Sequence, residues 1–178
     1  REPKAPEVIK DFARAEKLCG DLTKKYKGKV AKLSGDQLAR AIAEYEVIQE
    51  LFGKLGSYAS LLFAKNMTDP AGSQFYQNTQ EKLTTLSSRI LFFTLDLNKL
   101  SEKEMAAKLK SAALRRYAPW LRDLRSFRPY QLSDDLEKLL HEKYVSGRAA
   151  WNRLFDETIA GLRFPYGKDM LTEPQIFE

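Results

Sequence analysis

The stretch between Ser34 and Leu100 constrains the fold most, because its side chains keep a helical spacing over two long runs. In the first run, mainly apolar residues recur every seven positions with a second set between them: Leu38, Ala41, Tyr45, Ile48, Phe52, Leu55, Ala59 and Leu62. The second run repeats this spacing: Tyr76, Thr79, Leu83, Leu86, Ile90, Phe93, Leu97 and Leu100. Each run predicts one long amphipathic helix.

Local signals place the ends of these two helices. Ser34 followed by Gln37 is a capping box, and Asp69-Pro70 supplies a cap and a proline for the first position of the second helix. A turn this short makes neighbouring helices antiparallel, so we expect a long αα-hairpin. Further apolar residues lie partly outside the stripe, and other helices must therefore cover the hairpin: Leu61, Phe63, Phe75, Leu91 and Phe92.

The remaining sequence predicts an all-α, multi-helix lobe built on this hairpin. Further helices are expected from about Val8 to Gly28, from Met105 to Leu114, from Ser133 to Ser146, and from Arg148. In the last two, the apolar residues are expected to face inward and close the lobe: Leu136, Leu139, Leu140, Tyr144, Trp151, Leu154, Phe155, Ile159 and Leu162. A turn at Pro165–Lys168 predicts a short β-hairpin near the C-terminus, and Thr172 begins another helix.

The composition indicates a globular chain from a reducing compartment. Cys19 is the single cysteine of the 178 residues, which leaves no internal disulfide, and its neighbours favour a core thiol. No window approaches 18 uninterrupted apolar residues, and Arg1–Lys4 does not resemble a signal peptide. We therefore expect a cytoplasmic location and no membrane contact.

The net charge of +6 permits an acidic partner without requiring one. The segment Arg115–Pro129 alternates arginine with aromatic residues, as a phosphate-binding track with stacking platforms would. Alternatively, the arginine stems cover the helix surface and pair with Asp123 and neighbouring carboxylates. We favour this second interpretation, which argues against nucleic-acid binding.

No complete catalytic or metal site is found in the sequence. His141-Glu142 begins like a zinc peptidase motif, but Val145 occupies the position of the second histidine, and the chain has no other. Gly53 and Gly56 lie inside a predicted helix, where they favour close helix packing over phosphate binding. We assign no catalytic and no metal-binding residue.

Three longer segments resemble the N-terminal region of bacterial oligoendopeptidase F: Leu55–Pro70, Leu83–Leu100 and, most clearly, Arg128–Pro165. The resemblance implies a cytoplasmic zinc metallopeptidase related to thimet oligopeptidase, mostly helical, that cleaves short peptides. It also implies that the zinc-binding helix lies downstream, so zinc belongs to the parent enzyme and not to these residues. On this basis residues 1–164 form a helical N-terminal lobe, and residues 165–178 begin the following catalytic region.

The resemblance further implies that the lobe forms a wall of the substrate channel and restricts access by size. Arg122, Arg125 and Tyr130 are candidates to hold a peptide's carboxylates and backbone. The expected partners are the protein's own C-terminal catalytic region and short peptides. Two alternatives stay open: a helical protein-interaction or self-association module, and a nucleic-acid-binding domain that uses Arg115–Arg128.

Overall fold

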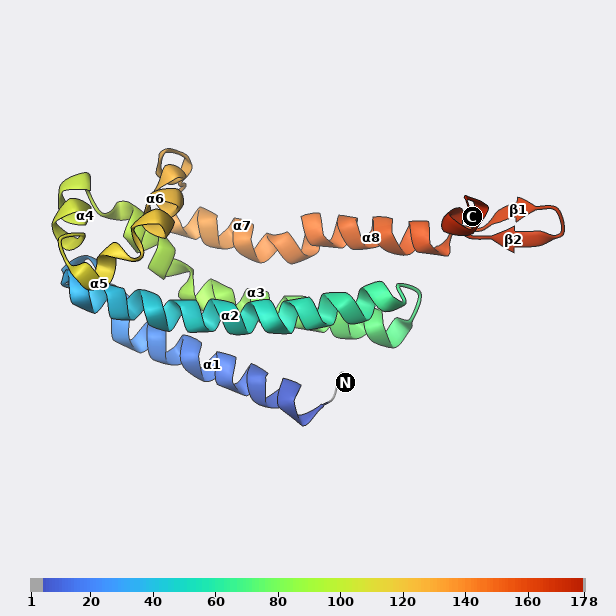
Figure 1. Cartoon of the computed structure of the whole chain (residues 1–178), viewed down its shortest axis with the longest axis horizontal. Coiled ribbons are helices and arrows are strands. Elements are labelled where there is room, and N and C mark those ends of the chain that lie inside the picture. Colours follow the sequence, from blue (N-terminus) through green and yellow to red (C-terminus); the bar gives the residue numbers. More distant parts are fainter. Residues whose placement is uncertain (1–4, 178) are drawn as a thin grey trace.

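A computed structural model describes residues 5–177 and confirms an all-α fold with a short β-hairpin. The helices α1 (Pro6–Tyr26), α2 (Gly35–Lys65) and α3 (Pro70–Lys99) form a bundle. The helices α7 (Asp134–Ser146) and α8 (Arg148–Gly161) make an arm that runs along this bundle (Figure 1).

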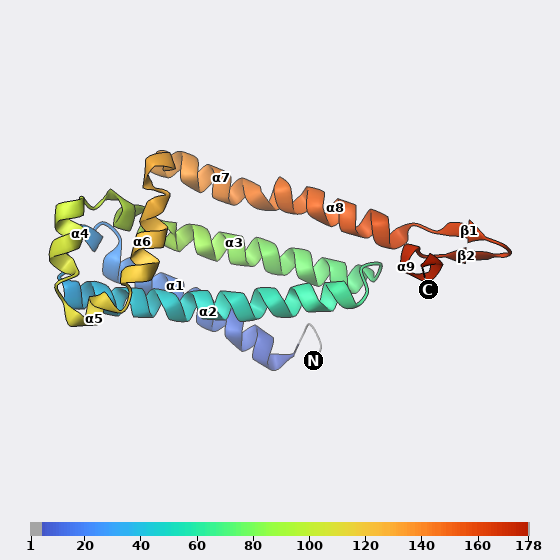
Figure 2. The ribbon, with the colours of Figure 1, turned by 45° about the horizontal axis from the view of Figure 1, so that its top comes forward.

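Short elements cluster at one end of the bundle, and the β-hairpin extends from the far end of the arm (Figures 1 and 2). The clustered elements are η1 (Val30–Lys32), α4 (Glu102–Lys108), α5 (Ala112–Arg115), α6 (Ala118–Ser126) and η2 (Arg128–Tyr130). Strands β1 (Phe164–Tyr166) and β2 (Asp169–Leu171) pair antiparallel, and α9 (Glu173–Ile176) follows them.

The predicted αα-hairpin is confirmed down to its caps. Ser34 Oγ accepts a hydrogen bond from the Gln37 amide at 3.3 Å, and Gln37 Oε1 accepts one from the Ser34 amide at 2.9 Å. At the turn, the Asp69 carboxylate accepts from the amides of Ala71 and Gly72. These contacts satisfy amides at the helix starts that have no partner within the helix.

The core lies between α1, α2 and α3 and extends under the short helices. Cys19, Leu22, Ile48 and Ile90 join α1 to the hairpin, and each leucine or isoleucine side chain contributes roughly 1.5–3 kcal/mol when it is fully buried. Burial raises the pKa of the Cys19 thiol to about 11, as expected for an unreactive core cysteine. A second cluster packs α5 and α6 on the hairpin through Leu114 and Leu121.

The predicted helix from Met105 to Leu114 is wrong, because the chain forms two helices there. Ser111 breaks the run: its hydroxyl caps α5 by accepting from the Leu114 amide at 3.3 Å, and it also contacts Asp36. Lys108 donates to the carbonyls of Ala31 and Leu33, which fixes the end of α4 beside η1. These tertiary contacts override the local helical pattern.

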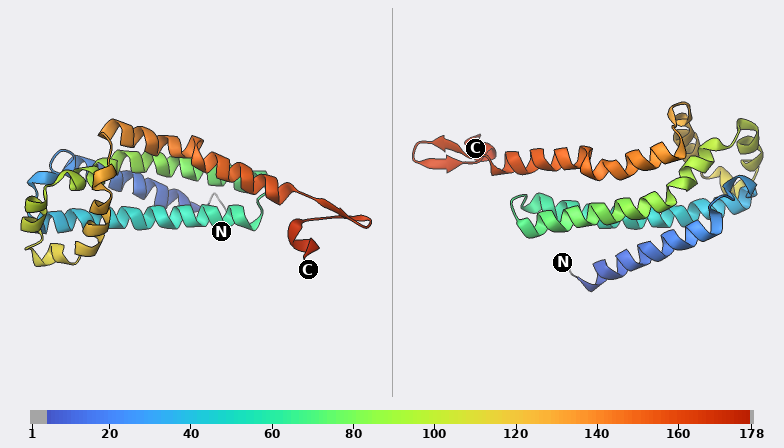
Figure 3. Two further views of the ribbon diagram at one scale, coloured as in Figure 1. Left: turned by 90° about the horizontal axis from the view of Figure 1, so that it is seen from above. Right: turned by 180° about the vertical axis from the view of Figure 1, so that it is seen from behind.

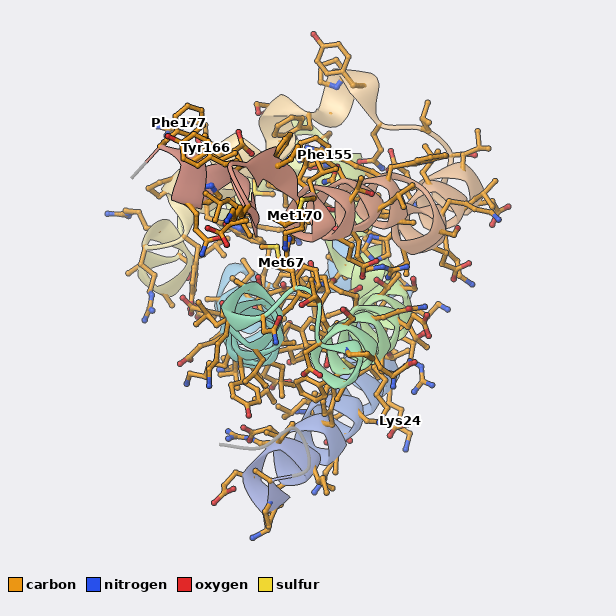
Figure 4. All side chains as sticks on the ribbon, turned by 90° about the vertical axis from the view of Figure 1, so that its right-hand side faces the viewer. Lys24, Met67, Phe155, Tyr166, Met170 and Phe177 are labelled. Carbon is orange, nitrogen blue, oxygen red and sulfur yellow. The ribbon has the colours of Figure 1, made fainter. Side chains whose placement is uncertain are left out.

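The expectation that α7 and α8 close the lobe is also wrong. The apolar side chains of both helices are exposed, for example Leu140 at 57%, Trp151 at 70% and Phe155 at 65%. Seen along the molecule, Phe155 lies on the side of the arm away from the bundle (Figure 4). The side of α8 that faces the bundle is more polar: Asn152, Arg153 and Asp156 border a cavity of about 60 Å³ beside α3.

Close packing at Gly53 and Gly56 is not found. A Cβ atom at Gly53 would meet nothing within 4 Å, and one at Gly56 would meet Leu83 Cδ1 at 3.6 Å, an ordinary contact. Across residues 5–177, no helix is both long enough and apolar enough to cross a membrane.

Candidate functional site

Arg125, predicted as an exposed peptide contact, is instead almost completely buried. Its guanidinium donates to the carbonyl oxygens of Leu97 at 2.8 Å and Leu100 at 2.9 Å, and to Glu102 Oε1 at 2.6 Å. Only 8% of the side chain is exposed. The Arg125 guanidinium lowers the pKa of Glu102, and Arg125 thereby joins α6 to the last turn of α3, where carbonyl groups lack helical partners.

The other two predicted contact residues face solvent. Arg122 lies on α6 with 77% of its side chain exposed and pairs with Asp123 Oδ1 at 2.9 Å. Tyr130 lies on η2 and is 79% exposed. The structure therefore does not bring the three candidates together as one site: two are accessible, and Arg125 is engaged inside the lobe.

The Arg115–Arg128 patch differs from a nucleic-acid track in the position of its aromatic residues. Tyr117 is buried, and Trp120 packs against the core with its ring centroid 6.1 Å from that of Tyr45. Phe127 is exposed at 69%. Arginines of the patch lie beside carboxylates, with Arg116 at 4.0 Å from Glu46 and Arg128 at 2.8 Å from Glu102.

His141 joins α7 to α3. Its Nε2 lies 2.7 Å from Ser87 Oγ, and that hydroxyl donates to the Thr84 carbonyl at 3.0 Å, so it accepts from the Nε2–H group. Burial lowers the pKa of His141, which favours the neutral ring. Because the serine proton is directed to a carbonyl, this pair does not have the geometry of a nucleophile and its base.

The described residues do not fit a zinc site. From residue 5 to residue 177, no three of the His, Cys, Asp and Glu side chains gather closely enough to hold a metal ion. His141 is hydrogen-bonded to Ser87, and Cys19 is buried with a raised pKa. A structural or catalytic zinc site needs three or four such ligands around one point.

The most distinctive surface of the molecule is apolar and follows the arm. We define the apolar arm face by its exposed residues: Leu136, Leu139, Leu140, Tyr144, Trp151, Leu154, Phe155, Ile159, Leu162, Phe164, Tyr166, Met170, Ile176 and Phe177. Figure 4 shows Phe155, Tyr166 and Phe177 on the side of the arm that points away from the bundle. Contiguous exposed apolar surface of this kind is a feature of interaction sites in general.

Helical spacing in the sequence identified most of the helical residues of this face but assigned them to the core. The pattern shows only that these side chains share one side of a helix. Which element covers that side is a tertiary property: α3 contacts α7, and Tyr144 borders the cavity beside α3, but Trp151, Leu154 and Phe155 stay more than half exposed.

The described residues thus form an all-α lobe with a large uncovered apolar face. Comparison with protein families gives a more particular assignment: residues 96–164 match the model of the peptidase M3 N-terminal domain, described as Oligopeptidase F. Searches of curated proteins and of solved structures found no match. The matched segment contains α4 to α8, and over these residues the resemblance to the N-terminal region of oligoendopeptidase F is confirmed.

Proposed function

We propose that this chain is the N-terminal, non-catalytic lobe of a cytoplasmic, zinc-dependent oligoendopeptidase. Its role is to pack against the catalytic region and to form one wall of the channel that admits short peptides. The observation that carries this proposal is the apolar arm face, because most of it lies within the segment that matches the peptidase M3 N-terminal domain.

The exposed area gives a physical reason for packing. Each large apolar side chain that moves from water into an interface contributes roughly 1.5–3 kcal/mol when burial is complete. Trp151, Leu154 and Phe155 lie within two turns of α8 and are each more than half exposed. Aromatic residues grouped in this way are typical centres of protein interfaces.

No described residue of this chain would hold the zinc of the proposed enzyme; bound elsewhere, the ion would supply the activation of water for peptide hydrolysis. The residues of this lobe act through shape and polar contacts. In this proposal the bundle excludes folded proteins, and Arg122 and Tyr130, whose exposure leaves them accessible, bind a peptide carboxylate or backbone. Arg125 takes part by holding α6, since peptide contact would require breaking its hydrogen bonds to α3.

Peptide hydrolysis tests this proposal directly. A chain extended through the encoded region downstream should cleave a quenched-fluorescent peptide, lose activity with the chelator o-phenanthroline, and leave a folded protein of similar sequence intact. The present 178 residues should not cleave the peptide, with or without the chelator. Stoichiometric zinc with chelator-sensitive cleavage by these residues alone, or an inactive extended chain, would contradict the proposed division of roles.

A second candidate function uses the same surface. Two copies could pair their apolar arm faces, which would make the lobe a self-association module.

The nucleic-acid alternative has less support, because four arginines of the Arg115–Arg128 patch each lie within 4.0 Å of a carboxylate oxygen: Arg116, Arg122, Arg125 and Arg128. A salt titration of nucleic-acid binding, with Arg122→Ala as the test variant, tests the nucleic-acid alternative.

A further inference from the structure

The β-hairpin at the end of the arm has free strand edges, and none of the roles proposed above uses them. Its two three-residue strands are exposed along almost their whole length. In both views of Figure 3 the hairpin extends beyond the turn between α2 and α3, so the bundle does not cover it. A two-stranded hairpin is marginally stable by itself, and a third strand would stabilise it.

Proline determines which backbone groups of the hairpin point outward. Facing residues of an antiparallel pair alternate between pairs that exchange two N–H···O=C bonds and pairs that exchange none. Pro165 has no N–H group, so the pair Pro165↔Met170 is of the second kind. The N–H and carbonyl groups of Met170 therefore point away from β1, and no residue from 5 to 177 hydrogen-bonds to them.

The free edge of β2 is better suited to a further strand than the free edge of β1. Pro165 presents a carbonyl group but no donor, and a proline of this kind closes a strand edge to pairing. Met170 presents both a donor and an acceptor. The edge is short, because the next outward amide, that of Thr172, already donates to Gln175 Oε1 at 2.9 Å.

Two exposed charges lie at the ends of this edge and complement the ends of a short peptide. Lys168 precedes β2, Glu173 follows Thr172, and neither has an ion-pair partner among residues 5–177. An antiparallel peptide brings its C-terminal carboxylate toward Lys168 and its N-terminal ammonium toward Glu173. A parallel peptide would bring like charges together at both ends. Asp169 shares the other face of the hairpin with Tyr166.

We infer that the free edge of β2 binds a short peptide as a third, antiparallel strand, in which one peptide residue exchanges two hydrogen bonds with Met170. The inference rests on the proposed function for the nature of the ligand. Bonds between main chains do not depend on the peptide's side chains, so this edge accepts peptides of many sequences. It is separate from Arg122 and Tyr130, because α6 and η2 lie at the opposite end of the molecule (Figure 1).

NMR of the isotope-labelled, intact 178 residues, titrated with a pentapeptide of alternating threonine and valine, tests the inference without catalysis. We expect saturable shifts of the backbone amide signals of Asp169, Met170 and Leu171. The charged termini fix the register, so N-methylation of the third peptide residue, which faces Met170, should weaken binding about fivefold. N-methylation of the fourth residue, whose amide points away from β2, is the control and should leave binding unchanged.

Met170→Pro is the matched change in the protein. It removes the outward N–H group and no bond to β1, so the peptide should bind about fivefold more weakly. Met170→Val keeps the N–H group and should bind like the parent chain. Lys168→Glu should weaken binding of the peptide with a free carboxylate by about two- to fivefold and leave binding of its C-terminal amide unchanged.

Equal affinity of the two methylated peptides, undiminished binding by Met170→Pro, or shifts confined to the bundle would each overturn the inference. A Met170→Pro variant that is monomeric where the parent chain associates, with no peptide shifts in either, would assign the edge to a second copy and overturn it as well. Binding is measured on a chain that needs no activity, so an inactive extended chain would contradict the proposed function alone. Absent peptide shifts beside an active extended chain would contradict this inference alone.

Discussion

Two glycines of α2 have opposite surroundings and predict opposite effects on stability. At Gly35, a Cβ atom would overlap the Lys108 carbonyl oxygen and lie 2.6 Å from Ser111 Cβ, whereas at Gly53 it would meet nothing within 4 Å. We expect Gly35→Ala to lower the free energy of unfolding by about 1–3 kcal/mol through overpacking against backbone. Gly53→Ala should raise it by about 0.5–1 kcal/mol, because alanine favours the helix interior.

Urea denaturation of both variants beside the parent chain measures these differences. Equal effects of the two substitutions would contradict the contact between α2 and the end of α4. The sequence predicts close packing at the wrong glycines, because the position of Gly53 and Gly56 inside a helix does not show which side chains lie beside them. The role of Gly35 depends on Lys108 and Ser111, which lie more than 70 positions away in the sequence.

His141 predicts a pH dependence near neutrality. Burial, opposed in part by Glu142, lowers its pKa below the ordinary 6.5, so the unfolded chain takes up a proton more readily than the folded one. The contribution of the neutral His141 to stability should therefore be fully present above about pH 6.5. The free energy of unfolding should decrease as the pH falls below that value. Denaturation at about pH 7.5 and about pH 5.5 measures this change.

His141→Gln is the control for this prediction, because glutamine does not titrate. The variant should have nearly the same stability at both pH values. The lowered pKa values of Glu50, Glu102 and Glu104 act below 4.5 and leave this window undisturbed. Stability that falls equally in the parent chain and in the variant would contradict the buried, neutral imidazole.

At the scale of elements, Arg125 and Arg122 give a matched pair on α6. Arg125 makes hydrogen bonds to two carbonyls of α3 and to Glu102, while Arg122 pairs with its neighbour Asp123 at the surface. We expect Arg125→Ala to lower the free energy of unfolding by about 2–4 kcal/mol, since it removes two part-buried, charge-assisted hydrogen bonds to carbonyls of α3.

Arg122→Ala should change stability by less than about 0.5 kcal/mol, as expected for an exposed ion pair. Thermal denaturation of both variants measures the two changes in stability. Hydrogen exchange at Leu97 and Leu100 shows whether the effect is located at the end of α3. If both variants were as stable as the parent chain, Arg125 would not hold α6 in place. That result would support the earlier prediction that Arg125 contacts a peptide.

Elements with strong local signals were predictable from sequence, and their burial was not. Capping residues placed the ends of α2 and α3, and Ser146-Gly147 placed the break between α7 and α8. These signals depend on hydrogen bonds within a few residues of the chain. The predicted inward face of Trp151 and Phe155 failed because amphipathic spacing shows that a face needs cover, but not whether the rest of the molecule supplies it.

At the scale of the whole molecule, the bundle and the arm differ in how well they are packed. The bundle buries residues of α1, α2 and α3 in two apolar clusters, whereas no residue of α7 or α8 is buried. The division into residues 1–164 and 165–178 stays a prediction. The uncovered face nevertheless defines how the lobe must behave in water, because apolar area of this kind drives association.

We therefore expect these 178 residues to self-associate reversibly as their concentration rises. The double substitution Leu154→Glu and Phe155→Glu places two charges within the apolar arm face and should shift the light-scattering mass toward the monomer. Leu61→Glu is the control: Leu61 is 71% exposed on α2 and outside this face, so the substitution should leave association unchanged. If the proposed function is right, a chain extended by the catalytic region should stay monomeric, because that region would cover the arm. Association by the extended chain and by the double variant alike would show that the arm is not the interface.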